Sequence, residues 1–252
     1  MTYSIVARDP ETGAYAVAVA SRFFAVGALV PHMAGGVGAV ATQAFVNPLY
    51  GVEGLAMLGA GASAADAVAA LTARDEGRAS RQVHMIDAAG RGAAFTGADC
   101  IDWAGHVAAE GVSVAGNMLA GPQVVERTLA AYQAHMHLPL ADRLLTAMEA
   151  GAAAGGDKRG TQSAALKIVR GEAYPWLDIR ADDHPDPLAE LRRLHAVAQE
   201  RYLIMAETLP TADNFSGMRD RTEIDRKINA VEEARIAAGR PSASFATPLK
   251  PG

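Results

Sequence analysis

Two short runs of small and apolar residues near the N-terminus predict a β-hairpin. Residues 3–7 and 14–20 form the two runs, and the segment 8–13 between them carries the Asp, Pro and Gly of a tight connection. The segment 35–43 is also small and apolar, which is typical of a strand covered on both faces. We therefore expect a third strand after the hairpin.

After Asn47-Pro48 the apolar residues recur at helical spacing. A first helix is expected to end near Leu58, and a second is expected from the Ser63 cap to about Arg74. The remaining expected elements are strands at 82–87, 92–96, 111–115 and 163–170, and helices at about 122–136, 139–154, 187–208 and 223–239. Runs of strands that alternate with runs of helices, without a regular βαβ order, predict an α+β protein with two sheets and helices outside them.

A chain of 252 residues, half of them apolar, is near the upper length that one hydrophobic core serves. We expect one main domain over residues 1–200. The charged amphipathic pattern near the C-terminus, followed by a tail with Pro and Ser, indicates a helical extension over residues 201–252. This extension is expected to serve packing or contacts in a homo-oligomer.

Charge and cysteine content exclude several classes of partner. The net charge is −5 and Lys and Arg do not cluster, so nucleic acid is not an expected partner. The single cysteine, Cys100, excludes an intramolecular disulfide and fits a reducing compartment. We find neither a signal peptide nor an apolar stretch approaching the roughly 20 residues of a membrane span. We therefore expect a soluble cytoplasmic protein with a small-molecule substrate and no membrane partner.

Thr2 is the first candidate for chemistry. Methionine aminopeptidase normally removes Met1 from a Met-Thr start, which leaves a threonine with its α-amino group beside its own hydroxyl. An α-amine with a pKa of about 7.7 can act as the general base for that hydroxyl. The alternative is that Thr2 is simply a strand former at the second position.

The predicted hairpin adds further candidates near Thr2. It carries Asp9 in its first turn, and it returns Ser21 and Arg22 toward the start of the first strand. A cation there would keep the amine neutral and stabilise an oxyanion, and Ser21 would relay a proton. Asp9 is a candidate for substrate binding. The alternative for Arg22 is a solvated charge at a strand end.

The segment 155–163 is the densest polar cluster in the chain and directly precedes an apolar strand. Asp157, Lys158, Arg159 and Gln162 are candidates for binding an anionic substrate, because glycine-flanked loops at strand ends expose backbone N–H groups and charges. The alternative is an ordinary surface turn. Asn117 closes a strand before a helix, where it would serve either an oxyanion hole or a helix cap.

Metal binding is the weaker interpretation of the remaining polar residues. Asp182, Asp183 and His184 are adjacent and have metal-binding side chains, but they precede a Pro-Asp-Pro that is typical of a turn into a helix. The histidines lack the spacing of zinc motifs. We therefore expect neither a metal nor another cofactor. Cys100 is expected to be a small buried apolar residue, with a reactive thiol as the alternative.

Nine motifs together resemble the bacterial and archaeal family catalogued as domain of unknown function 1028. They are YSIVARD (3–9), VASRFFAVG (19–27), GAVATQ (38–43), NPLYG (47–51), FTG (95–97), WAG (103–105), GNMLAG (116–121), GDKRG (156–160) and DDH (182–184). That family is similar in fold to the N-terminal nucleophile (Ntn) hydrolases, four-layer αββα proteins that cleave amide bonds. The resemblance implies that fold here, with Thr2 at the position of the nucleophile and Ser21 and Arg22 at the end of the second strand. The family itself has no settled activity.

These observations support one hypothesis and leave two alternatives open. The first is a hydrolase of a small carboxylate-bearing amide or ureide, in which Thr2 attacks and Asn117 or backbone N–H groups hold the oxyanion. Arg22, Lys158 and Arg159 would bind the substrate carboxylate. The alternatives are a non-catalytic small-anion-binding or assembly protein on the same fold, and a metal-dependent hydrolase that uses residues 182–184.

Overall fold

The computed structural model describes residues 2–246. The chain forms two compact units, one up to Leu191 and one from Arg192 onward.

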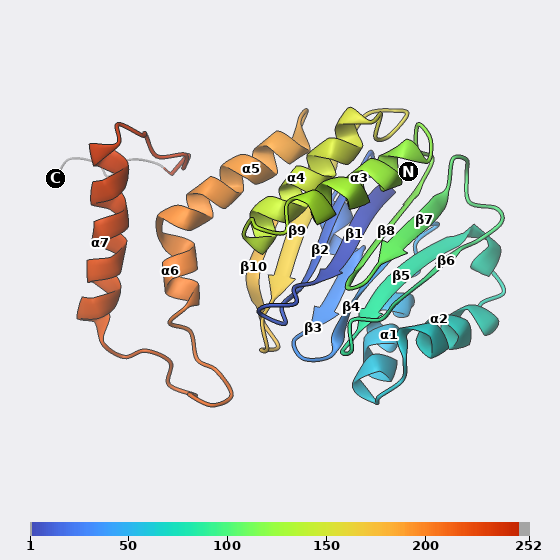
Figure 1. Ribbon diagram of the computed structural model, residues 1–252, viewed down its shortest axis with the longest axis horizontal. Helices are drawn as coiled ribbons and strands as arrows, with labels where there is room; N and C mark the ends of the chain where they lie inside the picture. Colours follow the sequence, from blue (N-terminus) through green and yellow to red (C-terminus); the bar gives the residue numbers. More distant parts are fainter. Residues whose placement is uncertain (1, 247–252) are drawn as a thin grey trace. The chain divides into compact units, whose positions relative to one another are not determined.

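The first unit contains a six-stranded sheet in the order β10-β9-β2-β1-β8-β7, in which all neighbours are antiparallel. Its strands are β1 (Thr2–Arg8), β2 (Tyr15–Ser21), β7 (Gly105–Ala109), β8 (Val112–Asn117), β9 (Ser163–Val169) and β10 (Pro175–Ala181). β1 lies in the middle, between β2 and β8 (Figure 1). The N-terminal residues of the chain are therefore held inside the sheet.

A second, four-stranded antiparallel sheet packs face to face on the first. It has the order β3-β4-β5-β6, with β3 (Pro31–Ala34), β4 (Gly38–Ala44), β5 (Arg81–Asp87) and β6 (Gly92–Thr96). Val6 and Val17 of the first sheet cluster with Ala39, Ala41 and Ile86 of the second. The small side chains on β4 explain the pattern at 35–43, because they let the two sheets approach closely.

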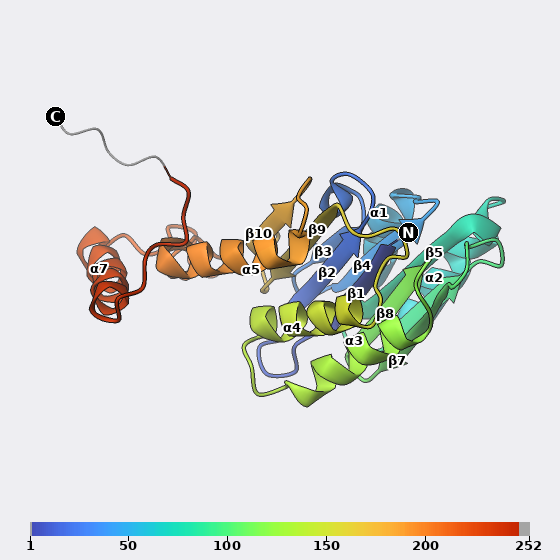
Figure 2. The same ribbon diagram turned by 90° about the horizontal axis from the view of Figure 1, so that it is seen from above.

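Helices cover the outer faces of both sheets (Figures 1 and 2). Helices α1 (Leu49–Gly59) and α2 (Ala64–Ala73) pack on the second sheet, and α3 (Gln123–Ala134) and α4 (Leu140–Ala153) pack on the first. Ser63 caps α2 as predicted, because its side chain accepts a hydrogen bond from the Asp66 amide. The prediction of an α+β protein with two sheets and outer helices is confirmed.

Three strands were not expected from the sequence. β7 and β10 are edge strands, and β3 is only four residues long. β10 begins at a proline and carries Asp178 and Arg180, which are features that natural edge strands tolerate and central strands do not. Strands that bury only part of one face have a weak apolar pattern, so the sequence did not reveal them.

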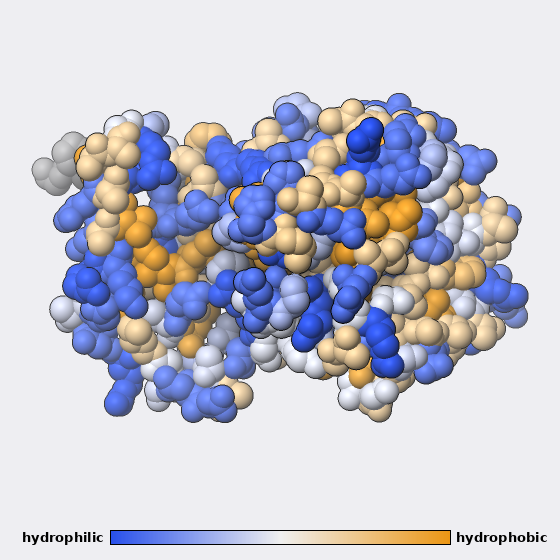
Figure 3. All heavy atoms as spheres, in the orientation of Figure 1, coloured by the Kyte–Doolittle hydropathy of each residue, from blue (hydrophilic) through white to orange (hydrophobic). Residues whose placement is uncertain are grey.

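In the second unit, the helix expected over 187–208 is present as three successive segments. These are α5 (Pro187–Val197), which begins in the first unit, a π-helical turn (Ala198–Tyr202) and α6 (Leu203–Ala206). α7 (Arg221–Ala237) starts at an Asp220 cap whose carboxylate accepts the Thr222 amide. Figure 3 shows apolar side chains gathered between α6 and α7, where Ile224 and Ile228 are buried.

None of the described helices is both long enough and apolar enough to cross a membrane.

Candidate active site

Thr2 begins β1 between two polar residues of the neighbouring strands. The register places it opposite Ser21 on β2 and opposite Asn117 on β8. Directly opposed residues of antiparallel strands project from the same face of a sheet. Val6, four residues after Thr2 and thus on the same face, packs against the second sheet. The three polar side chains therefore point together into the space between the sheets, and all three are buried.

The hydroxyls of Thr2 and Ser21 are in hydrogen-bond contact. Their oxygens are 3.0 Å apart, and either can be the donor. Ser21 Oγ also accepts a hydrogen bond from the Phe23 amide at 3.0 Å. The predicted hairpin has thus brought Ser21 beside Thr2, with the Ser21 hydroxyl fixed by its own backbone.

Asn117 has a defined orientation on the other side of Thr2. Its Nδ2 donates to Gln82 Oε1 at 3.1 Å and lies 3.5 Å from the Thr2 carbonyl oxygen. Gln82 Nε2 donates in turn to the carbonyl oxygens of Gly116 and Gly105, at 2.8 and 3.1 Å. Because carbonyl oxygens can only accept, Gln82 Oε1 must face Asn117, and Asn117 must present its nitrogen.

The same reasoning fixes a hydrogen-bond chain between the sheets. Gln43 Nε2 donates to Gln82 Oε1 at 2.8 Å, so Gln43 Oε1 accepts the Ser4 hydroxyl at 2.6 Å. Because the Ser4 hydroxyl donates its only proton to Gln43, Ser4 Oγ accepts a hydrogen bond from His84 Nε2 at 2.8 Å. His84 Nδ1 lies 3.0 Å from Ser113 Oγ, a hydroxyl that can donate or accept. The chain therefore requires a proton on His84 Nε2.

Burial supports the neutral state of His84. The imidazole is fully enclosed, and burial, with a smaller contribution from the charge of His106, lowers the pKa of His84 to about 3. Sequence reasoning missed this chain, because it considered the histidines only for the spacing of zinc motifs. The available signal was the occurrence of Gln43, Gln82 and His84 inside otherwise apolar predicted strands.

Acidification is expected to destabilise the fold through His84. Its folded pKa of about 3 lies below the ordinary value of 6.5, so the unfolded chain binds more protons between those values. The contribution of His84 is fully present above pH 6.5 and decreases as the pH falls toward 3, by up to about 1.4 kcal/mol per pH unit. Urea unfolding of wild type and His84→Gln across this range tests it, because the variant should show a flatter pH dependence. Parallel curves would contradict the expectation.

Asp157 joins the polar loop to the end of β2. Its buried carboxylate accepts the backbone amides of Arg22 at 3.1 Å and Arg159 at 2.7 Å, and it lies 3.5 Å from Arg159 Nε. Residue 157 also forms a bridge with Leu119, directly after β8. The Asp157 carboxylate therefore stabilises the loop through contacts within the protein. A bound ligand would contact the side chains next to Asp157.

Cationic side chains gather around this loop, two on the loop itself and one directly after β2. Arg22, Lys158 and Arg159 are exposed; Lys158 Nζ donates to the Asp102 carbonyl at 3.1 Å, and Arg22 Nη1 lies 3.4 Å from the Arg159 carbonyl. Gln162 donates its backbone amide to the Ser21 carbonyl at 2.8 Å. The loop is thus attached to the strand end that carries Ser21.

Asp9 does not join this group. It follows β1 at the end opposite Thr2, and seven residues of strand place the two about 20 Å apart. Its buried carboxylate contacts Arg143 Nη1 at 3.3 Å and accepts the Thr12 hydroxyl at 2.6 Å. The geometry gives Asp9 a structural role at the far end of the sheet.

Residues 182–184 are also engaged in separate contacts. Asp182 pairs with Arg180 at 2.6 Å, and Asp183 accepts Gln162 Nε2 at 3.0 Å. His184 Nδ1 lies 2.8 Å from the Asp186 carbonyl oxygen. Within residues 2–246, no three His, Cys, Asp or Glu side chains group as a metal site would require.

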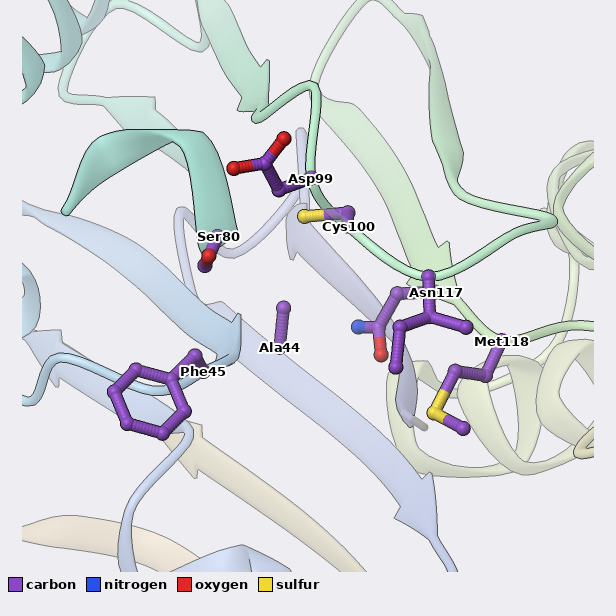
Figure 4. A pocket seen from close by; sticks show the side chains of 8 residues that line it. Ala44, Phe45, Ser80, Asp99, Cys100, Asn117 and Met118 are labelled. Carbon is purple, nitrogen blue, oxygen red and sulfur yellow. The ribbon is translucent and has the colours of Figure 1, made fainter.

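Two pockets lie beside Thr2 and Asn117. The first has a volume of about 80 Å³ and is lined by Thr2, Phe23, Val26, Leu29, Val30, Gln43, Ala44 and Val46. The second has a volume of about 290 Å³ and is lined by Ala44, Phe45, Ser80, Asp99, Cys100, Ile101, Asn117 and Met118 (Figure 4). Ala44 borders both, so the two pockets adjoin. Burial raises the pKa of the Cys100 thiol, which favours a small buried residue over a reactive thiol.

Unusual backbone conformations surround these pockets. Among the described residues, three non-glycine residues have a left-handed φ: Ala25 at 52°, Ala44 at 67° and Met118 at 56°. Ala44 and Met118 line the larger pocket, and Ala25 lies in the loop after β2. Such conformations concentrate at ligand-binding and catalytic sites, where the surrounding structure enforces them.

Fold and site together define an α+β protein whose central strand presents a threonine between two antiparallel sheets. Residues 2–191 match the sequence model described as a family of unknown function, DUF1028, and the chain belongs to this family. It is similar to the crystal structure of protein SPO2555 from Silicibacter pomeroyi, described as a DUF1028 protein. The identity is 34%, the TM-score is 0.81, and the match covers 87% of this chain and 96% of the other. No curated protein matches the chain.

Proposed function

We propose that the chain is an amide hydrolase of the Ntn type, with Thr2 as its nucleophile. The observation that carries this proposal is the position of the Thr2 hydroxyl, at the start of the central strand, between the sheets and beside a pocket. Helices outside two face-to-face sheets also agree with the four-layer αββα arrangement of that superfamily. The proposed chemistry needs no cofactor.

The mechanism begins with removal of Met1, which lies outside the described residues. The free amine of Thr2 takes the proton of its own hydroxyl, and Oγ1 attacks the carbonyl carbon of the substrate amide. The protonated amine then donates to the leaving nitrogen as the C–N bond breaks. Water attacks the resulting ester, and its proton returns through the amine, which releases the acid and restores Thr2. The Ser21 hydroxyl, 3.0 Å away, orients Oγ1 and relays the proton.

Asn117 supplies the donor for the oxyanion in this proposal. One hydrogen of Nδ2 is held by Gln82 Oε1 at 3.1 Å, while the other faces the Thr2 carbonyl at 3.5 Å, beyond the usual length of an N–H···O bond. The weaker of the two contacts leaves a hydrogen that a developing oxyanion can share. Gln82 acts as a positioning residue, because it fixes which edge of the Asn117 carboxamide faces Thr2.

The proposed substrate is a small carboxylate-bearing amide or ureide. The exposed cations Lys158 and Arg159 lie on the loop attached to the Ser21 end of β2, and Arg22 directly follows that strand. Together they would bind the carboxylate, with Gln162 beside them. These cations could bind an anion whether or not the Thr2 amine is free, so they also support a second candidate function. In that case the protein binds a small anion or supports an assembly, without turnover.

Intact-mass spectrometry of protein made without an N-terminal tag tests the hydrolase directly. We expect a mass that lacks Met1, and a covalent adduct after incubation with a threonine-directed β-lactone. Thr2→Ala should give no adduct, whereas Ser21→Ala retains the nucleophile but loses the hydroxyl that orients it, and should still be labelled, more slowly than wild type. A retained Met1 and an unmodified wild-type protein would instead support the anion-binding function.

A further inference from the structure

Asn117 carries a polar atom that the proposed hydrolysis does not use. Both hydrogens of Nδ2 face acceptors, Gln82 Oε1 and the Thr2 carbonyl oxygen, so a flipped carboxamide would set its oxygen against two acceptors. Oδ1 must therefore occupy the opposite edge. The side chain is only 2% exposed, and none of the described residues donates a hydrogen bond to Oδ1.

This oxygen opens onto the larger pocket. Asn117 lines that pocket, and Figure 4 shows its carboxamide extending into the pocket from the end of β8. Oδ1 has no hydrogen-bond partner among the described residues, yet protein atoms do not enclose it fully. It therefore borders free space. A buried acceptor that points into a cavity calls for a donor from a ligand, because leaving it unpaired costs free energy.

The rest of the lining selects the kind of donor. Phe45, Ile101 and Met118 make much of the wall apolar, and the lining contains no Lys or Arg. The Arg81 guanidinium lies outside, 5.0 Å from the centre of the Phe45 ring, and pairs with Asp75. The lining therefore offers no cation to a carboxylate, whereas an apolar group that ends in N–H fits both the wall and Oδ1.

We infer that this pocket binds the N–H-bearing end of the substrate, a compact and partly apolar group that donates a hydrogen bond to Asn117 Oδ1. The inference rests on the proposed hydrolysis, because it places that group on one side of the bond that Thr2 attacks. The volume of 290 Å³ holds roughly ten water-sized groups, which limits the bound part to a small head group. Ala44 and Met118, which line this pocket, have left-handed backbone conformations that the surrounding structure enforces.

The inference also orients the substrate. A carboxylate would meet the acceptor Oδ1 unfavourably in this pocket, and the exposed cations lie on the 157–159 loop instead. The substrate would then carry its negative charge toward that loop and its N–H group toward Asn117. Neutral amide or ureido groups and cationic amines share this N–H chemistry, and binding measurements separate them.

Binding of three matched probes to the full-length Thr2→Ala protein tests the inference without turnover. Benzamide and benzylamine carry N–H donors, whereas benzoate has the same ring and offers only acceptors. NMR titration of methionine methyl groups, with the Met118 signal assigned through Met118→Leu, reports both affinity and location. We expect one N–H probe to bind at least about tenfold more tightly than benzoate and to shift the Met118 signal. Tighter binding of benzamide would indicate a neutral amide or ureido group, and tighter binding of benzylamine an ammonium group.

Two variants locate the selectivity. Asn117→Leu should remove the preference for N–H probes, while the matched pocket variant Phe45→Leu should change all three affinities by similar factors. The carbonyl ¹³C shift of Asn117 in the Thr2→Ala protein is a second readout that survives even if Asn117→Leu fails to fold. Equal affinities, tighter binding of benzoate, no binding up to millimolar probe, or an unchanged Asn117 carbonyl would overturn the inference. If the wild-type protein hydrolyses no amide but the pocket prefers N–H probes to benzoate, only the hydrolase proposal is overturned. If the protein is active but the pocket lacks this preference, only the pocket assignment is overturned.

Discussion

Replacing Thr2 with alanine is expected to lower kcat/KM for amide hydrolysis by a factor of about a thousand or more. The substitution removes the only atom that the proposed mechanism lets attack the substrate, and loss of a nucleophile has effects of this size in other hydrolases. The measurement is release of amine or ammonia from a panel of N-acyl amino acids and ureides. The panel should be measured first with the wild-type protein, after its mass shows that Met1 is absent.

Thr2→Ser is the matched control for this prediction. Serine retains a hydroxyl beside an α-amine, so we expect activity within a factor of about ten to a hundred of wild type. Both variants should unfold at nearly the same denaturant concentration as wild type, because position 2 contributes a single hydroxyl contact, with Ser21. Equal activity of Thr2→Ala and wild type on any hydrolysed amide would remove Thr2 from the mechanism.

The central part of the fold was predictable because its signals are local. The runs 3–7 and 14–20 alternate faces within one hairpin, and the intervening turn fixes their pairing, so Thr2 and Ser21 had to meet across β1 and β2. The capped start of α2 is equally local. Edge strands such as β10 were missed because partial burial leaves little apolar pattern to detect.

The arrangement between the sheets could not be predicted in the same way. Ser4, Gln43, Gln82 and His84 come from strands far apart in the sequence, and each looks like an isolated polar residue in an apolar run. Their contacts depend on the relative position of the two sheets, which no local pattern encodes. The same limit applies to the orientation of Asn117, which follows from Gln82.

The hairpin was predicted correctly, but Asp9 was assigned to the wrong end of it. Sequence reasoning grouped Asp9 with Ser21 and Arg22 because all three flank the hairpin, but a turn and a strand end lie at opposite ends of the paired strands. The structure instead shows an ion pair with Arg143 on α4, and the two side chains are 7% and 4% exposed. Asp9 therefore links the β1–β2 turn to the helix layer.

Asp9→Ala is expected to lower the free energy of unfolding by about 3 to 5 kcal/mol. Removing one member of a buried ion pair leaves the other charge enclosed without compensation. Arg143 would keep only neutral partners, the carbonyl oxygens of Met136 and Leu138 and the Tyr132 hydroxyl. Denaturant unfolding at neutral pH measures the loss.

The double variant Asp9→Ala/Arg143→Met separates the charge effect from the loss of packing. It removes both charges, so it should be more stable than Asp9→Ala alone, and the two single changes should be far from additive. Under native conditions, kcat/KM of Asp9→Ala should stay near the wild-type value, because the carboxylate lies about 20 Å from Thr2. A raised KM with unchanged stability would instead return Asp9 to the substrate site, as the sequence first suggested.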